Sequence, residues 1–186
     1  MFNQAFLMLI VLALGGLLAA CASSDAPNTP KAASGTATGG LTVTSTAFSE
    51  GGNIPRQYSC QGDRMSPELA WSGAPAATQS YALVVEDPDA PSGTFIHWVA
   101  YDIPASQTQI SEGAGQAGKS GRNGARQPGY TPPCPPSGTH HYLFHVYALD
   151  IPTLNLPEGA TRDQVTGEMQ GHVLAQGTLT GKYQKQ

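Results

Sequence analysis

Glycine and proline limit the length of every regular element in this sequence. The 22 glycines and 15 prolines make up about a fifth of the 186 residues, above the roughly 12% of average proteins. Proline ends helices and central strands, and glycine weakens both. Only 12% of the residues are charged, while 40% are hydrophobic, which is enough for one core. The sequence therefore favours a loop-rich, mostly β domain and excludes collagen, a coiled coil and a wholly disordered chain.

Several segments show the residue pattern of strands, bounded by glycine or proline. They are Leu41–Phe48, Ser80–Asp87, Phe95–Asp102 and His140–Asp150. Thr161–Leu174 has a helical composition with Thr161 as its N-cap, and Thr178–Tyr183 predicts a last strand. This order of elements predicts a mostly β sandwich with one late helix.

The first residues of the chain are typical of an export signal. Phe6–Ala20 is an apolar run of fifteen residues, shorter than the roughly 20 that span a bilayer as a helix. The run ends in Leu18-Ala19-Ala20-Cys21, which resembles the bacterial lipobox. We therefore expect a lipoprotein signal peptide over residues 1–20 and lipidation of Cys21. An ordinary signal peptide, or a single anchor helix that carries a cysteine, is the alternative.

Residues 21–40 follow as a tether that is rich in Ala, Ser, Thr, Pro and Gly and lacks aromatic residues. Such a composition cannot bury enough apolar surface to offset the entropy of ordering. The domain is then expected over residues 41–186. The predicted location is the bacterial cell envelope, with the domain lipid-anchored at the periplasmic face of a membrane or at the outer cell surface.

Polar side chains end several of the predicted strands on otherwise apolar faces. Because side chains alternate along a strand, His140 and Tyr142 share a face, Asp87 ends its strand on an apolar face, and His97 shares a face with Val99. Polar groups at strand ends are typical of a small-ligand pocket. The alternative is that the aspartates form Asx turns and that the histidines are hydrogen-bonded core residues.

Two longer motifs contain these residues. D-P-D-A-P…G-T-F-I-H-W at 87–98 and G-Y-T-P-P-C-P-P-S-G-T-H-H-Y-L-F at 129–144 resemble the two signature regions of the phosphatidylethanolamine-binding protein family, in its bacterial Raf-kinase-inhibitor-like branch. The match extends over about residues 41–183. The resemblance implies a β-sandwich with Greek-key-like connections and one or two short helices.

The resemblance also implies a pocket for small anions or phosphorylated headgroups. Carried onto this chain, the pocket consists of Asp87, His97, His140 and Tyr142, with a rim of Pro135, Pro136 and Gly138. The family often has a cis peptide bond at such a rim. Imidazole and phenol groups donate hydrogen bonds to an anion, and without lysine or arginine the pocket is expected to bind weakly and less as pH rises. No cofactor is expected.

The cysteine count suggests a disulfide. If Cys21 is lipidated, Cys60 and Cys134 remain as a pair in an oxidising compartment. We expect a Cys60–Cys134 bridge; two buried thiols are the alternative.

Other motifs and the overall charge argue against nucleotide, metal and nucleic-acid binding. Residues 113–120 fit the Walker A pattern, but no strand is expected before them and no helix after them. His140 and His141 face opposite sides of a strand, so they cannot chelate one ion together. With nine basic residues and a net charge of −4, the chain is a poor nucleic-acid binder.

We therefore predict a non-enzymatic, membrane-anchored binding protein for a small anion or a phospholipid headgroup. An alternative is an inhibitor of a protease or signalling enzyme, which would bind its protein partner through loops at the pocket rim or through residues 113–129. A hydrolase that uses Asp87 and His97 as an acid–base pair is a third possibility.

Overall fold

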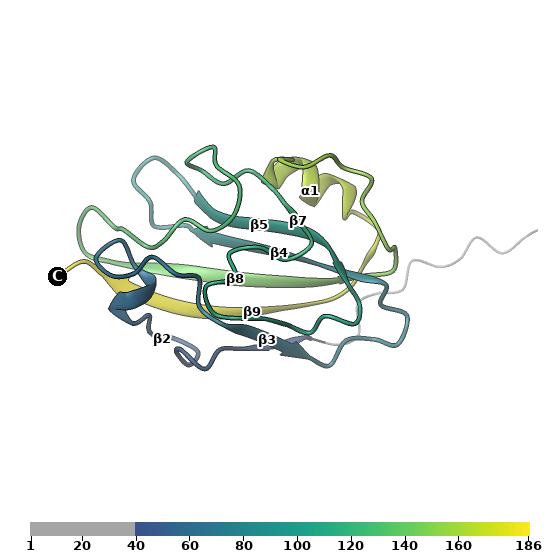
Figure 1. Cartoon of the computed structure of the whole chain (residues 1–186), viewed down its shortest axis with the longest axis horizontal. Helices are drawn as coiled ribbons and strands as arrows, with labels where there is room; N and C mark the ends of the chain where they lie inside the picture. The colour runs from purple at the N-terminus through teal and green to yellow at the C-terminus, as the bar shows by residue number, and fades with distance from the viewer. Residues whose placement is uncertain (1–39) are drawn as a thin grey trace, which may run out of the picture. The chain divides into compact units, whose positions relative to one another are not determined.

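The domain consists of two sheets and one short α-helix (Figure 1) in a computed structural model that describes residues 40–186. The larger sheet has the order β2 (Gly52–Asn53), β9 (Val173–Gln184), β8 (Thr139–Leu149), β4 (Ser80–Asp87), β5 (Phe95–Pro104) and β7 (Lys119–Ser120). The smaller sheet has the order β1 (Thr42–Thr44), β3 (Leu69–Ser72) and β6 (Gln109–Ile110). The helices are η1 (Arg56–Tyr58), a 3-10 turn, and α1 (Arg162–Glu168).

The larger sheet contains the Greek-key connection that the sequence resemblance implied. Within the larger sheet, β4, β5 and β7 are successive strands that pair antiparallel, although the chain passes through β6 of the smaller sheet between β5 and β7. The chain then returns by a long connection, so that β8 pairs with the opposite edge of β4. The spatial order β8-β4-β5-β7 is the Greek-key order.

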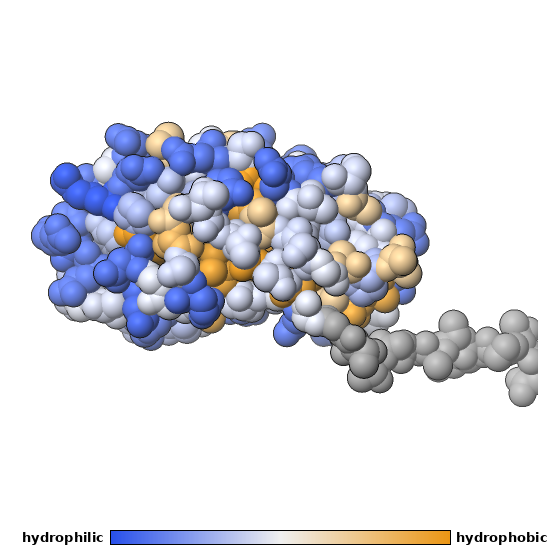
Figure 2. Space-filling view, turned by 90° about the horizontal axis from the view of Figure 1, so that it is seen from below, coloured by the Kyte–Doolittle hydropathy of each residue, from blue (hydrophilic) through white to orange (hydrophobic). Residues whose placement is uncertain are grey.

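Both faces of the larger sheet are covered at β4, which explains why nearly every residue of this strand is buried, whereas Gln176 and Thr178 of β9 are exposed. One face packs against the smaller sheet, and Trp71 of β3 meets Tyr81 of β4 with ring centroids 5.3 Å apart. The other face packs against Val165 and Met169 of the α1 region and against the loop before it. Seen from the side of the smaller sheet, hydrophobic residues stay visible in the middle of the surface (Figure 2). The mostly β prediction is confirmed, but the unequal sheets do not close into a complete sandwich.

A β-bulge at His97 corrects one predicted side-chain orientation. Val85 pairs with Trp98 and Glu86 pairs with Ile96, so His97 is the extra residue between them. His97 and Trp98 consequently both face the smaller sheet, and Val99 faces the α1 layer. Simple alternation wrongly placed Val99 on the face of His97, because it assumes an uninterrupted register.

The lengths of three predicted elements also differ from the structure. The strand predicted at Leu41–Phe48 covers only Thr42–Thr44 as β1. The helix ends at Glu168 rather than Leu174, because Gly171 turns the chain with a φ of 83°. The residues that follow join β9, which pairs with β8 along its whole length. Thr161 is the N-cap, as predicted, and forms a capping box with Gln164.

The predicted signal peptide, the lipidation of Cys21 and the tether lie outside the described residues, apart from Gly40 at the end of the tether. Within residues 40–186, no helix has the length and apolar character needed to cross a membrane.

Candidate functional site

A buried aspartate–histidine pair joins the two central strands of the larger sheet at one end. Asp87 ends β4 and His140 lies near the start of its antiparallel neighbour β8. The Nδ1 of His140 lies 2.7 Å from the Oδ2 of Asp87, and the side chains are only 8% and 5% exposed. Since a carboxylate only accepts hydrogen bonds, Nδ1 of His140 carries the proton and donates it, which leaves Nε2 for another partner.

The next aspartate forms a second, exposed pair with the next histidine. The Oδ2 of Asp89 accepts hydrogen bonds from the backbone N–H and from the Nδ1 of His141, at 2.8 and 2.7 Å. These hydrogen bonds lower the pKa of the Asp89 carboxyl. The Oδ1 of Asp87 also accepts from the backbone N–H of Asp89, which is an Asx turn. Asp87 therefore forms the Asx turn that was the alternative interpretation of the sequence, and it also pairs with His140.

His97 lies in the bulge and is bound to a backbone carbonyl. Its Nδ1 is 2.7 Å from the carbonyl oxygen of Thr131, so it donates to that oxygen. Burial lowers the pKa of His97, which favours the neutral ring. Its ring packs edge-on against Phe95 and Tyr142, with centroids 4.9 and 5.1 Å away. His97 is thus fixed in orientation and tautomer, with only Nε2 unused.

These side chains border a cavity of about 270 Å³ between the β4–β5 turn and the loop before β8. It is lined by Asp87, Ala90, Pro91, Ser92, Gly93, Phe95, His97, Thr131, Pro132, Cys134, Pro135, Pro136 and His140. The lining is mostly apolar and contains no lysine or arginine. Five of the seven residues predicted to form the pocket are therefore brought together here.

Tyr142 and Gly138 do not line the cavity. Tyr142 is two residues further along β8 than His140, about 7 Å deeper between the sheets, and is 1% exposed behind His97. Its hydroxyl has no hydrogen-bond partner within residues 40–186, and burial raises its pKa. Gly138 lies at the turn into β8 with a φ of 68° and has no side chain to contribute. The implied cis peptide bond is also absent, since peptide bonds throughout the described domain are trans.

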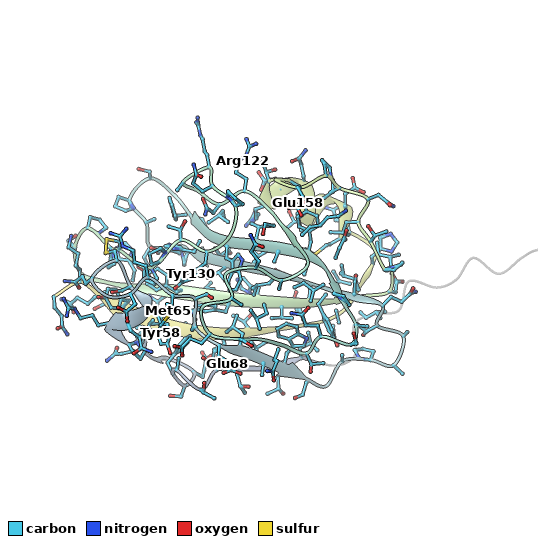
Figure 3. The ribbon with its side chains drawn as sticks, in the orientation of Figure 1. Tyr58, Met65, Glu68, Arg122, Tyr130 and Glu158 are labelled. Atoms are coloured by element: carbon cyan, nitrogen blue, oxygen red, sulfur yellow. A yellow bond between two sulfur atoms is a disulfide. The ribbon has the colours of Figure 1, made fainter. Side chains whose placement is uncertain are left out.

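The predicted disulfide is present, and one of its cysteines, Cys134, lines the cavity. Figure 3 draws a disulfide as a yellow bond between two sulfur atoms. Cys60 and Cys134 are bonded, with Cα atoms 5.4 Å apart. The backbone N–H of Cys60 also donates to the carbonyl of Pro133. The bridge therefore ties the loop after η1 to the segment that carries Pro135 and Pro136.

The suggested acid–base pair of Asp87 and His97 is not hydrogen-bonded. The partner of Asp87 is His140, and the partner of His97 is the Thr131 carbonyl. Ser92 and Thr131 both line the cavity, and within residues 40–186 no side-chain hydrogen bond joins either hydroxyl to Asp87, His97 or His140. The structure thus shows a fixed Asp–His pair to which neither hydroxyl is hydrogen-bonded.

The Walker A-like segment has a structural explanation. It ends in strand β7, where the Nζ of Lys119 contacts the Oδ2 of Asp102 at 3.0 Å and donates to the carbonyl of Leu156 at 2.9 Å. Within the described part of the chain, no group of three or more His, Cys, Asp or Glu residues is arranged to hold a metal ion.

Sequence reasoning missed several residues that shape the cavity. The backbone carbonyl of Thr131 fixes the ring of His97. Every residue has a backbone carbonyl, so the sequence does not indicate which one accepts this hydrogen bond. Phe95 forms part of the wall although it was considered only as a strand residue. Pro91, Pro132 and Cys134 also lie in the two motifs, so the sequence could have added them to the wall.

Comparisons with known proteins agree with this architecture. The sequence profile described as phosphatidylethanolamine-binding protein matches residues 44–184. A UPF0098 protein of Methanothermobacter thermautotrophicus is 43% identical over 145 residues, which cover 75% of this chain and 95% of that protein. A homologous UPF0098 protein of Chlamydia muridarum is 43% identical over 150 residues, covering 78% and 99%.

Solved structures show the same fold. A phosphatidylethanolamine-binding protein homologue of Chlamydia trachomatis superposes with a TM-score of 0.76 at 42% identity, covering 79% of this chain and 99% of that one. Escherichia coli YbcL, described as a member of the mammalian family, gives a TM-score of 0.73 at 31% identity, covering 78% and 99%. With the profile spanning most of the sequence, this chain belongs to the phosphatidylethanolamine-binding protein family.

Proposed function

We propose that this protein is a non-enzymatic binding protein whose cavity takes a small anion or the phosphorylated headgroup of a lipid. The observation that carries the proposal is the cavity of about 270 Å³ bordered by the Asp87–His140 pair and by His97. The volume lies just below the range of roughly 300–1,000 Å³ of pockets for drug-sized ligands. It therefore suits one phosphate, carboxylate or short headgroup.

The hydrogen bonds within the site determine how an anion can bind. The Nδ1 atoms of His97 and His140 already donate, to Thr131 and to Asp87. Each ring keeps only Nε2, which accepts when the ring is neutral and donates when it is protonated. An anion therefore binds best together with a proton, and its affinity falls as pH rises.

The absence of a basic side chain from the cavity lining limits the affinity. A guanidinium or ammonium group would attract an anion at every physiological pH, whereas here the positive charge must come from an imidazolium. Weak, pH-dependent binding distinguishes this site from a tight phosphate site. The same lining offers no activated nucleophile, which supports a role in binding rather than in catalysis.

Thermal unfolding with added ligands tests the proposal. Inorganic phosphate, phosphorylethanolamine and acetate are each added to the full chain and to His97→Ala. A ligand at about ten times its Kd adds about 1.4 kcal/mol, which raises the Tm of a domain of this size by about 3–5 °C. We expect this shift in the wild type, larger at mildly acidic pH, and its loss in His97→Ala.

His172→Ala is the matched control, because this half-buried histidine also pairs with an aspartate, Asp150, and does not line the cavity. It should keep the ligand-induced shift. No shift with any of the three ligands in the wild type, or equal shifts in both variants, would contradict the proposal. Stabilisation by a protease without any anion effect would favour the inhibitor role, and ester or phosphoester turnover lost in His97→Ala would favour an enzyme.

We also propose that the domain is held at a bacterial envelope membrane by lipid on Cys21. The lipobox-like ending of the apolar run supports this, since two or more acyl chains give stable anchoring. Radiolabelled palmitate should label the expressed full chain and fail to label Cys21→Ala. Equal labelling of both chains would contradict the lipid anchor without affecting the cavity proposal.

A further inference from the structure

A second, positively charged region lies outside the cavity, where the loop 121–129 meets the start of α1. Arg122, Arg126 and Arg162 line a cleft of about 670 Å³ together with Thr94 and one acidic residue, Asp163. Arg122 and Arg126 also line an adjacent hollow of about 460 Å³, together with Glu158. Figure 3 shows Arg122 among the loops above β5 and β7, with Glu158 nearer to α1. Two arginines thus connect two neighbouring hollows.

Arg122 and Arg126 form no ion pair in the described domain, although the carboxylates of Asp163 and Glu158 line the same two hollows. Arg162 pairs with Glu86 and Asp163, both at 3.1 Å. Within residues 40–186, no carboxylate oxygen lies within 4 Å of the guanidinium nitrogens of Arg122 or Arg126. On a chain with a net charge of −4, this cleft is a local positive region, in contrast to the cavity.

The loop that carries these arginines is held in place by other residues. Asn123 is 5% exposed, and its Oδ1 accepts hydrogen bonds from the backbone N–H groups of Ala125 and Gln127. Its Nδ2 donates to the carbonyl of Gly129. No side-chain hydrogen bond of Arg122 or Arg126 takes part in this network. The loop therefore presents both guanidinium groups without using them for its own stability.

We infer that this arginine cleft binds a phosphate group, as a second anion site separate from the cavity. A planar guanidinium donates paired hydrogen bonds that match phosphate oxygens. Two guanidinium groups that are not engaged in an ion pair within residues 40–186 supply this at every physiological pH, without the proton that the cavity needs. The phosphate can belong to a soluble phosphorylated compound or to a lipid headgroup, and the two sources are separated by experiment.

The site is separable from the cavity because the two lie on opposite faces of the same strand. Phe95 and His97 line the cavity, whereas Ile96 and Thr94 line the cleft. Substitutions of the arginines should therefore leave phosphate binding in the cavity unchanged, and His97→Ala should leave the cleft intact. Failure of one site does not imply failure of the other.

The test uses the double variant R122Q/R126Q of the full chain. Its control is R56Q/R64Q, which removes two positive charges from exposed arginines outside the cleft. Arg64 and Arg126 share a φ of 62°, so each double variant places one glutamine in the same left-handed backbone conformation. Two probes are used: soluble phosphorylethanolamine, followed by NMR shifts of the loop 121–129, and phosphatidylcholine vesicles with and without phosphatidic acid. We expect R122Q/R126Q to weaken binding about tenfold or more and R56Q/R64Q to weaken it much less.

The two probes identify the source of the phosphate. Shifts in the loop with the soluble probe show that a free phosphorylated compound suffices. Binding only to vesicles with phosphatidic acid, reduced by added salt and lost in R122Q/R126Q, assigns the cleft to lipid headgroups. Equal weakening in the two double variants would overturn the inference, because only net charge would then matter. Tighter binding of an oligoglutamate peptide than of any phosphate probe would overturn it as well, in favour of peptide docking.

Discussion

His97 makes the stability of the domain depend on pH. Burial lowers the pKa of His97 in the folded state below the value of about 6.5 in the unfolded chain. The unfolded chain therefore binds more protons between those two values, and the folded state loses stability as pH falls below about 6.5. We predict that the free energy of unfolding in urea decreases with acidification in this range and that the decrease is smaller in His97→Gln. An identical pH dependence of both chains would show that His97 does not cause it.

A bound anion should reduce this dependence of stability on pH. It favours the protonated ring of His97, so it should oppose the loss of stability at low pH.

The site residues themselves were largely predictable from sequence. Asp87 and His140 lie near the ends of the neighbouring strands β4 and β8. Alternation gave the face of each residue on its own strand, and the family resemblance placed both in one pocket. The place of Tyr142 was not predictable, because depth between two sheets depends on the packing of both.

At the scale of elements, β4, β5 and β8 were predictable, whereas the longest strand, β9, was predicted only over Thr178–Tyr183 and several short strands were missed. The bounds of β4 match the predicted segment, and β5 and β8 match within about two residues, since each carries its own apolar pattern. Strands β2, β6 and β7 have two residues each and exist only through pairing with a distant partner. The bulge in β5 was also missed, because one inserted residue leaves no pattern in the sequence.

The loop 121–129 packs against the ring of Phe95 in the cavity wall, and a substitution at Gly124 tests whether this contact shapes the cavity. A Cβ atom at Gly124 would lie 2.7–2.9 Å from three ring atoms of Phe95, which lines the cavity. We predict that Gly124→Ala shifts this ring, lowers stability by about 1–3 kcal/mol and reduces the phosphate-induced rise in Tm. Gly167→Ala in α1 is the control, since nothing lies within 4 Å, and it should gain about 0.5–1 kcal/mol. A full phosphate response in Gly124→Ala would show that the loop does not shape the cavity.

At the scale of the whole molecule, one covalent bond links stability to ligand binding. The Cys60–Cys134 bridge spans 74 residues of sequence, and closing a loop of that length restricts the unfolded chain by up to about 4 kcal/mol. It also fixes the segment that carries Pro135 at the cavity wall. We predict that C60S/C134S lowers the free energy of unfolding in urea by about 2–4 kcal/mol, followed by the fluorescence of the buried Trp71 and Trp98.

The same variant separates the two anion sites. Cys134 lines the cavity but not the arginine cleft, so C60S/C134S should lose phosphate binding in the cavity and keep the response of the loop 121–129. Reduction of the wild type by dithiothreitol should reproduce both effects. If the variant keeps full stability, or if the denatured, unreduced wild type shows reactive thiols at Cys60 and Cys134, the bridge does not contribute to the folded protein in solution. If both sites weaken together, the bridge stabilises the domain as a whole rather than the cavity wall.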